Sequence, residues 1–301
     1  MPLTASRFAL NPLQWLATDD GWPDFGAAPP LAERLAVIAK AGFTAIQAEV
    51  PKDSDPARYR AELAEYGIAP GPGYVNLPWD DDAAERAAHL GQVRRLAREA
   101  VALGNPLLFL AMGMSPDAPR IARPAVGFGA DPAFLSAVRD YLAEAAAAIT
   151  AEGGVAALHP HVGSWVETEA ETRYVLDSVD PAVLKFGADA GHLAWTGADP
   201  ARVIGDYADR VAGIHVKDLH HGVARRSREE GLTYQQSVAA GLWTEPGFGD
   251  ADLPGVLAAL GNDFDGWVVV EVDRGSVPPA ESVARCGAWL ARTVGGAQQG
   301  S

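Results

Sequence analysis

Several features that mark particular classes of protein are missing from this sequence. Its single cysteine, Cys286, excludes an intramolecular disulfide and a zinc cluster built from cysteines, and its apolar helical surroundings predict burial. The segment 1–15 has neither the basic start nor the apolar run of a signal peptide, and no run of about 18 apolar residues could span a membrane. The motif GxGxxG is absent, which argues against a dinucleotide site. We therefore expect a cytoplasmic protein without a membrane partner.

Positive charge is also scarce. Lysine and arginine number 24 against 39 aspartates and glutamates, so the net charge is −15. Such a chain repels nucleic-acid phosphates and anionic membranes, which leaves a small molecule as the expected partner. Hydrophobic residues make up 48% of the chain, enough for a large core.

Strand and helix patterns alternate along the whole chain. Leu31, Leu35 and Ile38 fall at helical spacing before Gly42, and the next residues alternate as a strand. The strands are expected at residues 8–11, 43–51, 68–76, 105–113, 155–163, 184–189, 211–218 and 267–274. The helices are expected at residues 31–42, 55–66, 80–103, 131–149, 168–176, 199–207, 253–261 and 279–293.

Eight strands alternating with helices, without a low-complexity linker, predict an α/β fold of one domain. We expect a single closed eight-stranded parallel (β/α)8 TIM barrel over residues 1–295 and a flexible tail at residues 296–301. In such barrels the active site lies at the carboxyl ends of the strands. The long connection at residues 219–250 falls at that end and is expected to be a functional loop.

Polar side chains gather where three of the predicted strands end. Because side chains alternate along a strand, His215 and Lys217 share one face and point into the barrel mouth. Glu271 is expected beside His215. Asp189 ends its strand before a glycine turn, and His192 follows three positions later.

Two carboxylates and an imidazole form a mixed oxygen and nitrogen site that suits Mn²⁺ or a similar divalent ion. Asp189, His215 and Glu271 are the predicted ligands, and the strand at residues 155–163 must add a fourth. That strand offers His159 and His161, and Glu167 follows shortly after it. We expect Glu167 to be the ligand and His161 to face the substrate.

Each of these residues also has a structural interpretation. A lone histidine more often makes a structural hydrogen bond than binds a metal. Asp189 could be a turn residue, Glu271 a rim charge and Glu167 the residue before a helix cap. The joint placement of Asp189, His215 and Glu271 at three strand ends favours a functional site.

Several motifs resemble those of the xylose isomerase-like sugar isomerase and epimerase superfamily. They are HPHVGSWVE, DAGHLAW, IHVKD, EPGFGDAD and VVVEVD. The segment NPLQWLATDDGWPDFG and the pattern HxHxG most resemble the inosose dehydratase branch. The resemblance implies an eight-fold barrel with a divalent metal held by two glutamates, an aspartate and a histidine. Asp189, His215 and Glu271 match that set, but histidines stand where the family has its strand-five glutamate.

The resemblance and the expected metal imply proton abstraction next to a carbonyl, through an enediolate. Dehydration of an inosose such as 2-keto-myo-inositol is the favoured reaction, and ketose 3-epimerisation or aldose–ketose isomerisation is the alternative. A non-catalytic sugar-binding barrel is a more distant alternative, and the acidic charge argues against a related apurinic endonuclease. The expected cofactor is Mn²⁺, with Co²⁺, Mg²⁺ or Zn²⁺ as alternatives.

The expected partner is a small sugar or cyclitol. The sequence does not decide whether the protein forms a homo-oligomer. The sequence assigns each candidate residue a role. The catalytic candidates are Glu271, His161, His192 and Lys217. The substrate-binding candidates are Gln14, Trp15, Trp22, Glu49, His159 and Trp243.

Overall fold

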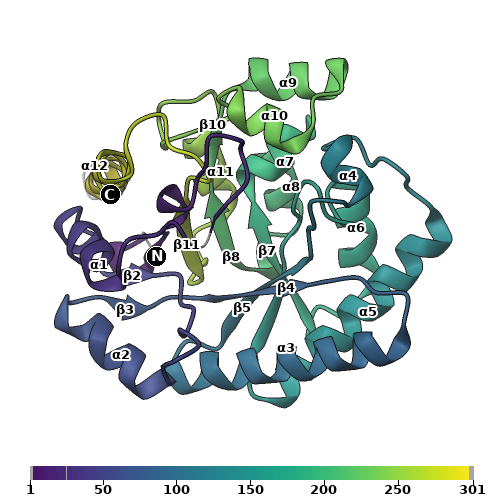
Figure 1. Ribbon diagram of the computed structural model, residues 1–301, viewed down its shortest axis with the longest axis horizontal. Coiled ribbons are helices and arrows are strands. Elements are labelled where there is room, and N and C mark those ends of the chain that lie inside the picture. Colours follow the sequence, from purple (N-terminus) through teal and green to yellow (C-terminus); the bar gives the residue numbers. More distant parts are fainter. Residues whose placement is uncertain (1–2, 25, 298–301) are drawn as a thin grey trace.

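The computed structural model describes residues 3–24 and 26–297, which form one curled parallel sheet with helices on its outer side (Figure 1). The strands lie in the order β3-β2-β1-β11-β8-β7-β6-β5-β4. In chain order they are β1 (Phe8–Asn11), β2 (Ala45–Ile46), β3 (Ala69–Pro70), β4 (Gly73–Leu77), β5 (Leu107–Met112), β6 (Val155–Leu158), β7 (Leu184–Asp189), β8 (Val211–Val216) and β11 (Trp267–Glu271).

The sheet has nine strands, so the expectation of eight was wrong in one place. The third predicted strand splits into β3 and β4 around Gly71 and Pro72. Pro72 has no backbone N–H to donate, and a Cβ on Gly71 would lie 2.7 Å from the Ile46 carbonyl oxygen. Because β3 pairs with β2 while β4 pairs with β5, the two pieces lie at the two ends of the strand order. Instead of the closed barrel that we expected, the strands form a curled nine-stranded sheet with β3 and β4 as its two edges, which two residues of chain join.

All eight predicted helices are present. They are α1 (Leu31–Lys40), α2 (Pro56–Glu65), α3 (Ala83–Leu103), α5 (Pro132–Ala151), α6 (Glu169–Ser178), α8 (Pro200–Asp206), α11 (Leu253–Ala259) and α12 (Pro279–Ala297). Because α12 runs to Ala297, it includes the first two residues of the predicted tail, and residues 298–301 lie outside the described residues. Within residues 3–24 and 26–297, no helix is both long enough and apolar enough to cross a lipid bilayer.

The structure has further short elements. They are η1 (Ala5–Arg7), η2 (Leu13–Trp15), α4 (Pro119–Ala122), α7 (Ala190–Trp195), η3 (Ala208–Arg210), β9 (Asp218–Leu219), α9 (His221–Glu230), α10 (Tyr234–Ala239) and β10 (Trp243–Thr244). All of them except η1 and η3 lie in connections that follow the carboxyl ends of strands. The predicted loop at residues 219–250 is therefore a folded insertion, in which β9 and β10 pair antiparallel. The predicted glycine turn after Asp189 is the short helix α7, which Asp189 caps by accepting a hydrogen bond from the His192 backbone N–H.

Phe109 on β5 fills the inside of the curled sheet. A Cβ on Gly187 or Gly213 would lie 2.6 or 2.8 Å from the Phe109 ring, so these two glycines make room for it. The ring centroid of Phe109 lies 5.5 Å from that of His159 and 4.3 Å from that of His215. The sheet therefore provides an aromatic floor beneath the candidate site.

Candidate active site

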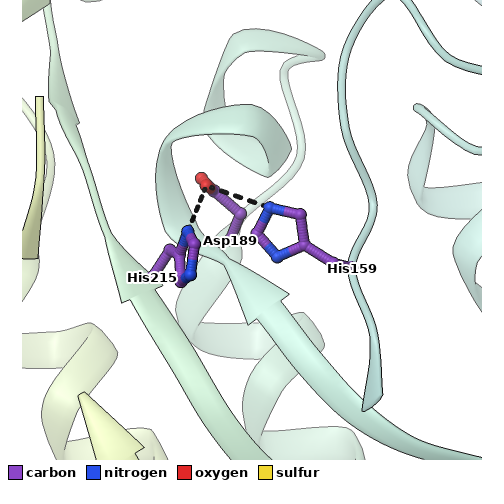
Figure 2. Close-up of side chains that lie close together, drawn as sticks. All are labelled: His159, Asp189 and His215. Atoms are coloured by element: carbon purple, nitrogen blue, oxygen red, sulfur yellow. Dashed lines mark ion pairs between the residues drawn. The ribbon is translucent and has the colours of Figure 1, made fainter. Parts of the chain in front are cut away.

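Three buried side chains from adjacent strand ends face one another (Figure 2). His159 directly follows β6, Asp189 ends β7, and His215 lies on β8. Asp189 Oδ2 is 3.8 Å from His159 Nε2 and 3.9 Å from His215 Nδ1. One ligand atom from each residue lies within 4.8 Å of the others, which is the arrangement expected of metal ligands. We call these residues the metal trio.

Hydrogen bonds around the metal trio show which atoms are free. His159 Nδ1 lies 3.0 Å from the Gly187 carbonyl oxygen, which can only accept, so Nδ1 carries the proton and Nε2 is a free lone pair. Asp189 Oδ1 accepts from the His192 N–H at 2.8 Å. Among the described residues, Asp189 Oδ2 and His215 Nε2 are buried without a hydrogen-bond partner, while His215 Nδ1 lies 3.1 Å from Glu271 Oε2. Buried orphaned acceptors are costly, and a divalent cation would satisfy them.

Glu271 lies next to the metal trio, as predicted, at the end of β11. Its Oε2 is 3.1 Å from His215 Nδ1 and accepts a hydrogen bond from Asn11 Nδ2. Its Oε1 forms an ion pair with Lys217 Nζ. Burial alone would raise the pKa of Glu271, but Lys217 and His215 outweigh burial and hold the pKa well below its usual range.

Lys217 is fully buried and joins the acidic groups of the site. Its Nζ lies 3.6 Å from Asp189 Oδ2 and 3.0 Å from Asp273 Oδ1. Burial lowers the pKa of Lys217, but Asp273, Glu271 and Asp189 together raise it well above the usual value, so the side chain is an ammonium. Trp243 stacks against this ammonium, with its ring centroid 5.0 Å from Nζ.

The carboxylates outnumber the ammonium three to one, which makes the site acidic. Burial raises the pKa of Asp189, and it raises the pKa of Asp273 to about 7 despite the opposing charge of Lys217. A buried excess of acidic groups disfavours the folded state unless a cation binds there. The electrostatics therefore agree with the orphaned atoms in favouring a divalent metal ion.

His161 lies at the wall of the cavity beside the metal trio. Its Nδ1 is 2.9 Å from the Val162 carbonyl oxygen, so Nδ1 carries the proton and Nε2 has a free lone pair. Burial, together with Lys217, lowers the pKa of His161 to about 3, and the imidazole is therefore neutral at pH 7. His192, one of the catalytic candidates, is fully buried and is not in the cavity wall, and its Nε2 lies 3.1 Å from Lys217 Nζ.

A cavity of about 1300 Å³ opens above these residues. Its inner end is lined by Asn11, Tyr74, His159, His161, Glu271 and Asp273. Carboxylates, imidazoles and an amide therefore surround the position where a polar substrate would meet the metal trio.

Glu167 does not lie with the metal trio, in contrast to its predicted role as a ligand. It is fully buried, and its carboxylate accepts backbone hydrogen bonds from Ala125 at 3.1 Å, Gly127 at 2.8 Å and Gly163 at 2.9 Å. All three donors belong to loops, so Glu167 holds loops together. The residue after β6 that meets Asp189 and His215 is His159, which the sequence assigned to substrate binding.

The substrate-binding candidates separate into two groups. Glu49, Trp22 and His159 line the cavity. Three others are not in its wall: Gln14, Trp15 and Trp243. Gln14 Nε2 lies 3.8 Å from Cys286 Sγ, and Trp15 packs against the core. Trp243 packs against the Lys217 ammonium. Cys286 is buried, as predicted.

Four residues of the site were not among the sequence candidates. Asp273 and Asn11 had a sequence signal, because Asp273 shares the inward face of Glu271 and Asn11 is a polar residue that ends an apolar strand. Tyr74 and Phe109, whose rings pack against the metal-trio histidines, had no such signal. Their role depends on which strands face one another inside the curled sheet.

Comparison with known proteins places these features in a family. The rhizopine catabolism protein MocC of Rhizobium meliloti is 30% identical over 286 residues, covering 90% of this chain and 83% of that protein. The inosose dehydratase of Geobacillus kaustophilus is 28% identical over 278 residues, covering 89% of this chain and 87% of that enzyme.

Solved structures share the fold. The IolI protein, determined with a bound zinc atom, has a TM-score of 0.67 at 17% identity and covers 96% of this chain and 98% of that one. An L-ribulose 3-epimerase has a TM-score of 0.69 at 15% identity, with coverages of 98% and 96%. The family model of the xylose isomerase-like TIM barrel matches residues 35–293. The chain therefore belongs to the xylose isomerase-like TIM barrel family.

Proposed function

We propose that this protein is a divalent-metal-dependent enzyme that removes water from a keto-polyol of the inosose type. The observation that carries the proposal is the buried metal trio, with its orphaned ligand atoms, beside the polar inner end of a cavity. The substrate class is supported by relatives named inosose dehydratase, among them one 25% identical over 96% of this chain.

His159 Nε2, Asp189 Oδ2 and the His215 imidazole would hold the metal, with Glu271 beside them. When bound, such an ion polarises a substrate carbonyl and stabilises the negative charge that develops once a neighbouring proton is removed. His159 is prepared for this role, because its Nδ1 proton is already donated to the Gly187 carbonyl oxygen.

We assign the removal of the carbon-bound proton to Glu271. Its carboxylate lines the cavity, is ionised, and is held by Asn11 and Lys217. Dehydration also needs a proton for the departing β-hydroxyl. Asp273 faces the same cavity and contacts Lys217, so we assign proton donation to the Asp273 carboxyl group, and the hydroxyl leaves as water.

The tautomer of His161 decides how this catalytic candidate would act on the substrate. A histidine whose free nitrogen is unprotonated accepts a hydrogen bond, so His161 Nε2 would orient a substrate hydroxyl group instead of protonating a leaving group. His192 would support Lys217 from behind the cavity wall.

The test is to incubate Mn²⁺-loaded protein with 2-keto-myo-inositol in D₂O and follow both ultraviolet absorbance and deuterium content. An absorbing enone product is the expected result. Deuterium uptake into recovered substrate, without an enone, would instead indicate an epimerase or isomerase. If protein that holds manganese gives neither signal, the proposed function is wrong.

A further inference from the structure

A continuous wall of aromatic rings leads from the candidate metal centre to the outer part of the cavity. The ring of Tyr234 stacks on His161 at an angle of 17° and a centroid distance of 6.4 Å. On its other side Trp22 packs edge-on, with a centroid distance of 6.2 Å. All three side chains line the cavity. The wall therefore runs from His161, two positions after His159 in the sequence, through Tyr234 to Trp22.

Two connections that are distant in sequence build this wall. Tyr234 begins α10 in the folded insertion, and Trp22 lies in the connection between β1 and α1, whose purple trace rises toward α10 (Figure 1). The backbones are in close contact, because a Cβ on Gly21 would lie 2.5 Å from the Gln235 carbonyl oxygen. Trp195 supports Tyr234 from α7 at a centroid distance of 5.1 Å. The wall is thus fixed by packing on both sides.

The character of the lining changes along the cavity. The inner end is polar, as described above, whereas the outer part beside Trp22 is mostly apolar. That apolar lining consists of Leu13, Leu16, Ala17, Pro23 and Val238. Scattered exposed apolar side chains are ordinary on a protein surface, but a contiguous concave set is typical of a binding site.

The cavity is larger than a single-ring substrate. Its volume of about 1300 Å³ is spread over several regions, because the lining reaches Arg95 and Leu103 on α3 as well as Trp22, and only part of this volume lies beside Trp22. A free cyclitol carries hydroxyl groups around its whole rim. If it occupied the polar end, it would leave the apolar part filled with water.

We propose that Trp22, Tyr234, Leu16, Ala17 and Val238 form an outer subsite for a second ring-sized group, attached to the polyol that reaches the metal trio. This inference rests on the proposed function and narrows its substrate class to keto-polyols that carry a bulky substituent with an apolar face, as a glycoside does. Aromatic side chains favour such faces, since stacking on them buries apolar area at both surfaces.

The experiment compares two probes that share one sugar ring, the 3-keto forms of methyl β-glucoside and phenyl β-glucoside. Their affinities for Mn²⁺-loaded protein are measured by calorimetry. We expect the phenyl glucoside to bind at least about tenfold more tightly, because its ring buries apolar surface against Trp22. Trp22→Ala should weaken binding of the phenyl glucoside far more than binding of the methyl glucoside, and so remove this preference.

Further variants separate loss of the subsite from loss of folding. Ala17→Trp fills the same corner, because Ala17 and Pro23 are bridge partners beside Trp22, and it should weaken only the phenyl glucoside. Tyr234→Phe keeps the ring and should keep the preference. Phe248→Ala removes an aromatic ring that is 50% exposed and lies outside the cavity wall, and it should leave both affinities unchanged.

The outcomes distinguish this inference from the proposed function. Three results would each overturn the outer subsite, even if 2-keto-myo-inositol is dehydrated. They are equal affinities of the two probes for the unaltered protein, equal weakening of both probes by Trp22→Ala, and no binding of the phenyl glucoside. If the phenyl preference depends on Trp22 but 2-keto-myo-inositol is not dehydrated, the subsite stands and the assigned reaction fails.

Discussion

The carbonyl oxygen of Gly187 lies 3.0 Å from His159 Nδ1, and this contact leaves His159 Nε2 free to face Asp189. Gly187 is the residue that makes room for Phe109, whose ring packs edge-on against His159. Gly187 therefore helps to orient His159 in two ways, through its carbonyl oxygen and by making room for the Phe109 ring. This relationship explains why His159, and not Glu167, is the member of the metal trio that follows β6.

We expect His159→Gln to reduce the metal content and Glu167→Gln to leave it unchanged. His159→Gln should lower the manganese retained after dialysis at least about tenfold, because it removes a nitrogen ligand. Glu167→Gln should keep one metal per chain but lower the melting temperature, because a neutral amide oxygen accepts the loop N–H groups less strongly. Both quantities are measured by metal analysis and calorimetry. Loss of metal in the Glu167 variant with retention in the His159 variant would reverse the assignment.

Replacing Lys217 by methionine should destabilise the metal-free protein. The variant keeps the length of the side chain but leaves Asp189, Glu271 and Asp273 without their shared ammonium. Removing one partner from a fully buried ion pair costs about 3–5 kcal/mol of unfolding free energy. Urea unfolding with and without Mn²⁺ measures the effect, and the ion should restore part of the loss. An unchanged midpoint without metal would show that Lys217 is not the balancing charge.

The buried ion pair of Arg120 should contribute far more to the free energy of unfolding than an exposed ion pair does. Arg120 is buried and contacts both carboxylate oxygens of Glu171, at 2.6 and 2.9 Å. Arg120→Met should lower the unfolding free energy by about 3–5 kcal/mol, since it leaves a buried carboxylate unpaired. The matched control is Arg202→Met, which breaks a pair with Glu169 at a half-exposed arginine and should cost below about 1 kcal/mol. Equal losses in the two variants would contradict this interpretation.

Asp273 should make the metal-free protein less stable as pH rises. Burial raises its pKa from the ordinary 3.8 to about 7, so the folded state binds this proton more tightly than the unfolded state does. The stabilisation from protonated Asp273 is therefore greatest at low pH and declines from about pH 4 to about pH 7. Asp273→Asn cannot lose a proton, and the stability difference between the variant and the unaltered protein should change across that window. Parallel pH profiles would show that Asp273 titrates normally.

Much of the fold could be predicted from local pattern. The eight helices were expected from spacing and caps such as Asp131 and Asp199, which do accept the first-turn N–H groups. Strand parity predicted that His215 faces Glu271, because alternation of side chains is a property of the strand itself. The break of the third strand at Gly71 and Pro72 was missed, because the two pieces have different neighbouring strands. The helices α7, α9 and α10 were missed as well, since a turn and a loop were expected there.

The sequence by itself determined the family, the acidic character and three of the site residues: Asp189, His215 and Glu271. Only the tertiary structure decided between Glu167 and His159. Both are polar groups shortly after one strand, and no local rule states which one meets β7 and which one is used by the loop N–H groups. The same holds for Trp22 and Tyr234, since their contact depends on two connections, distant in sequence, that meet above the same cavity.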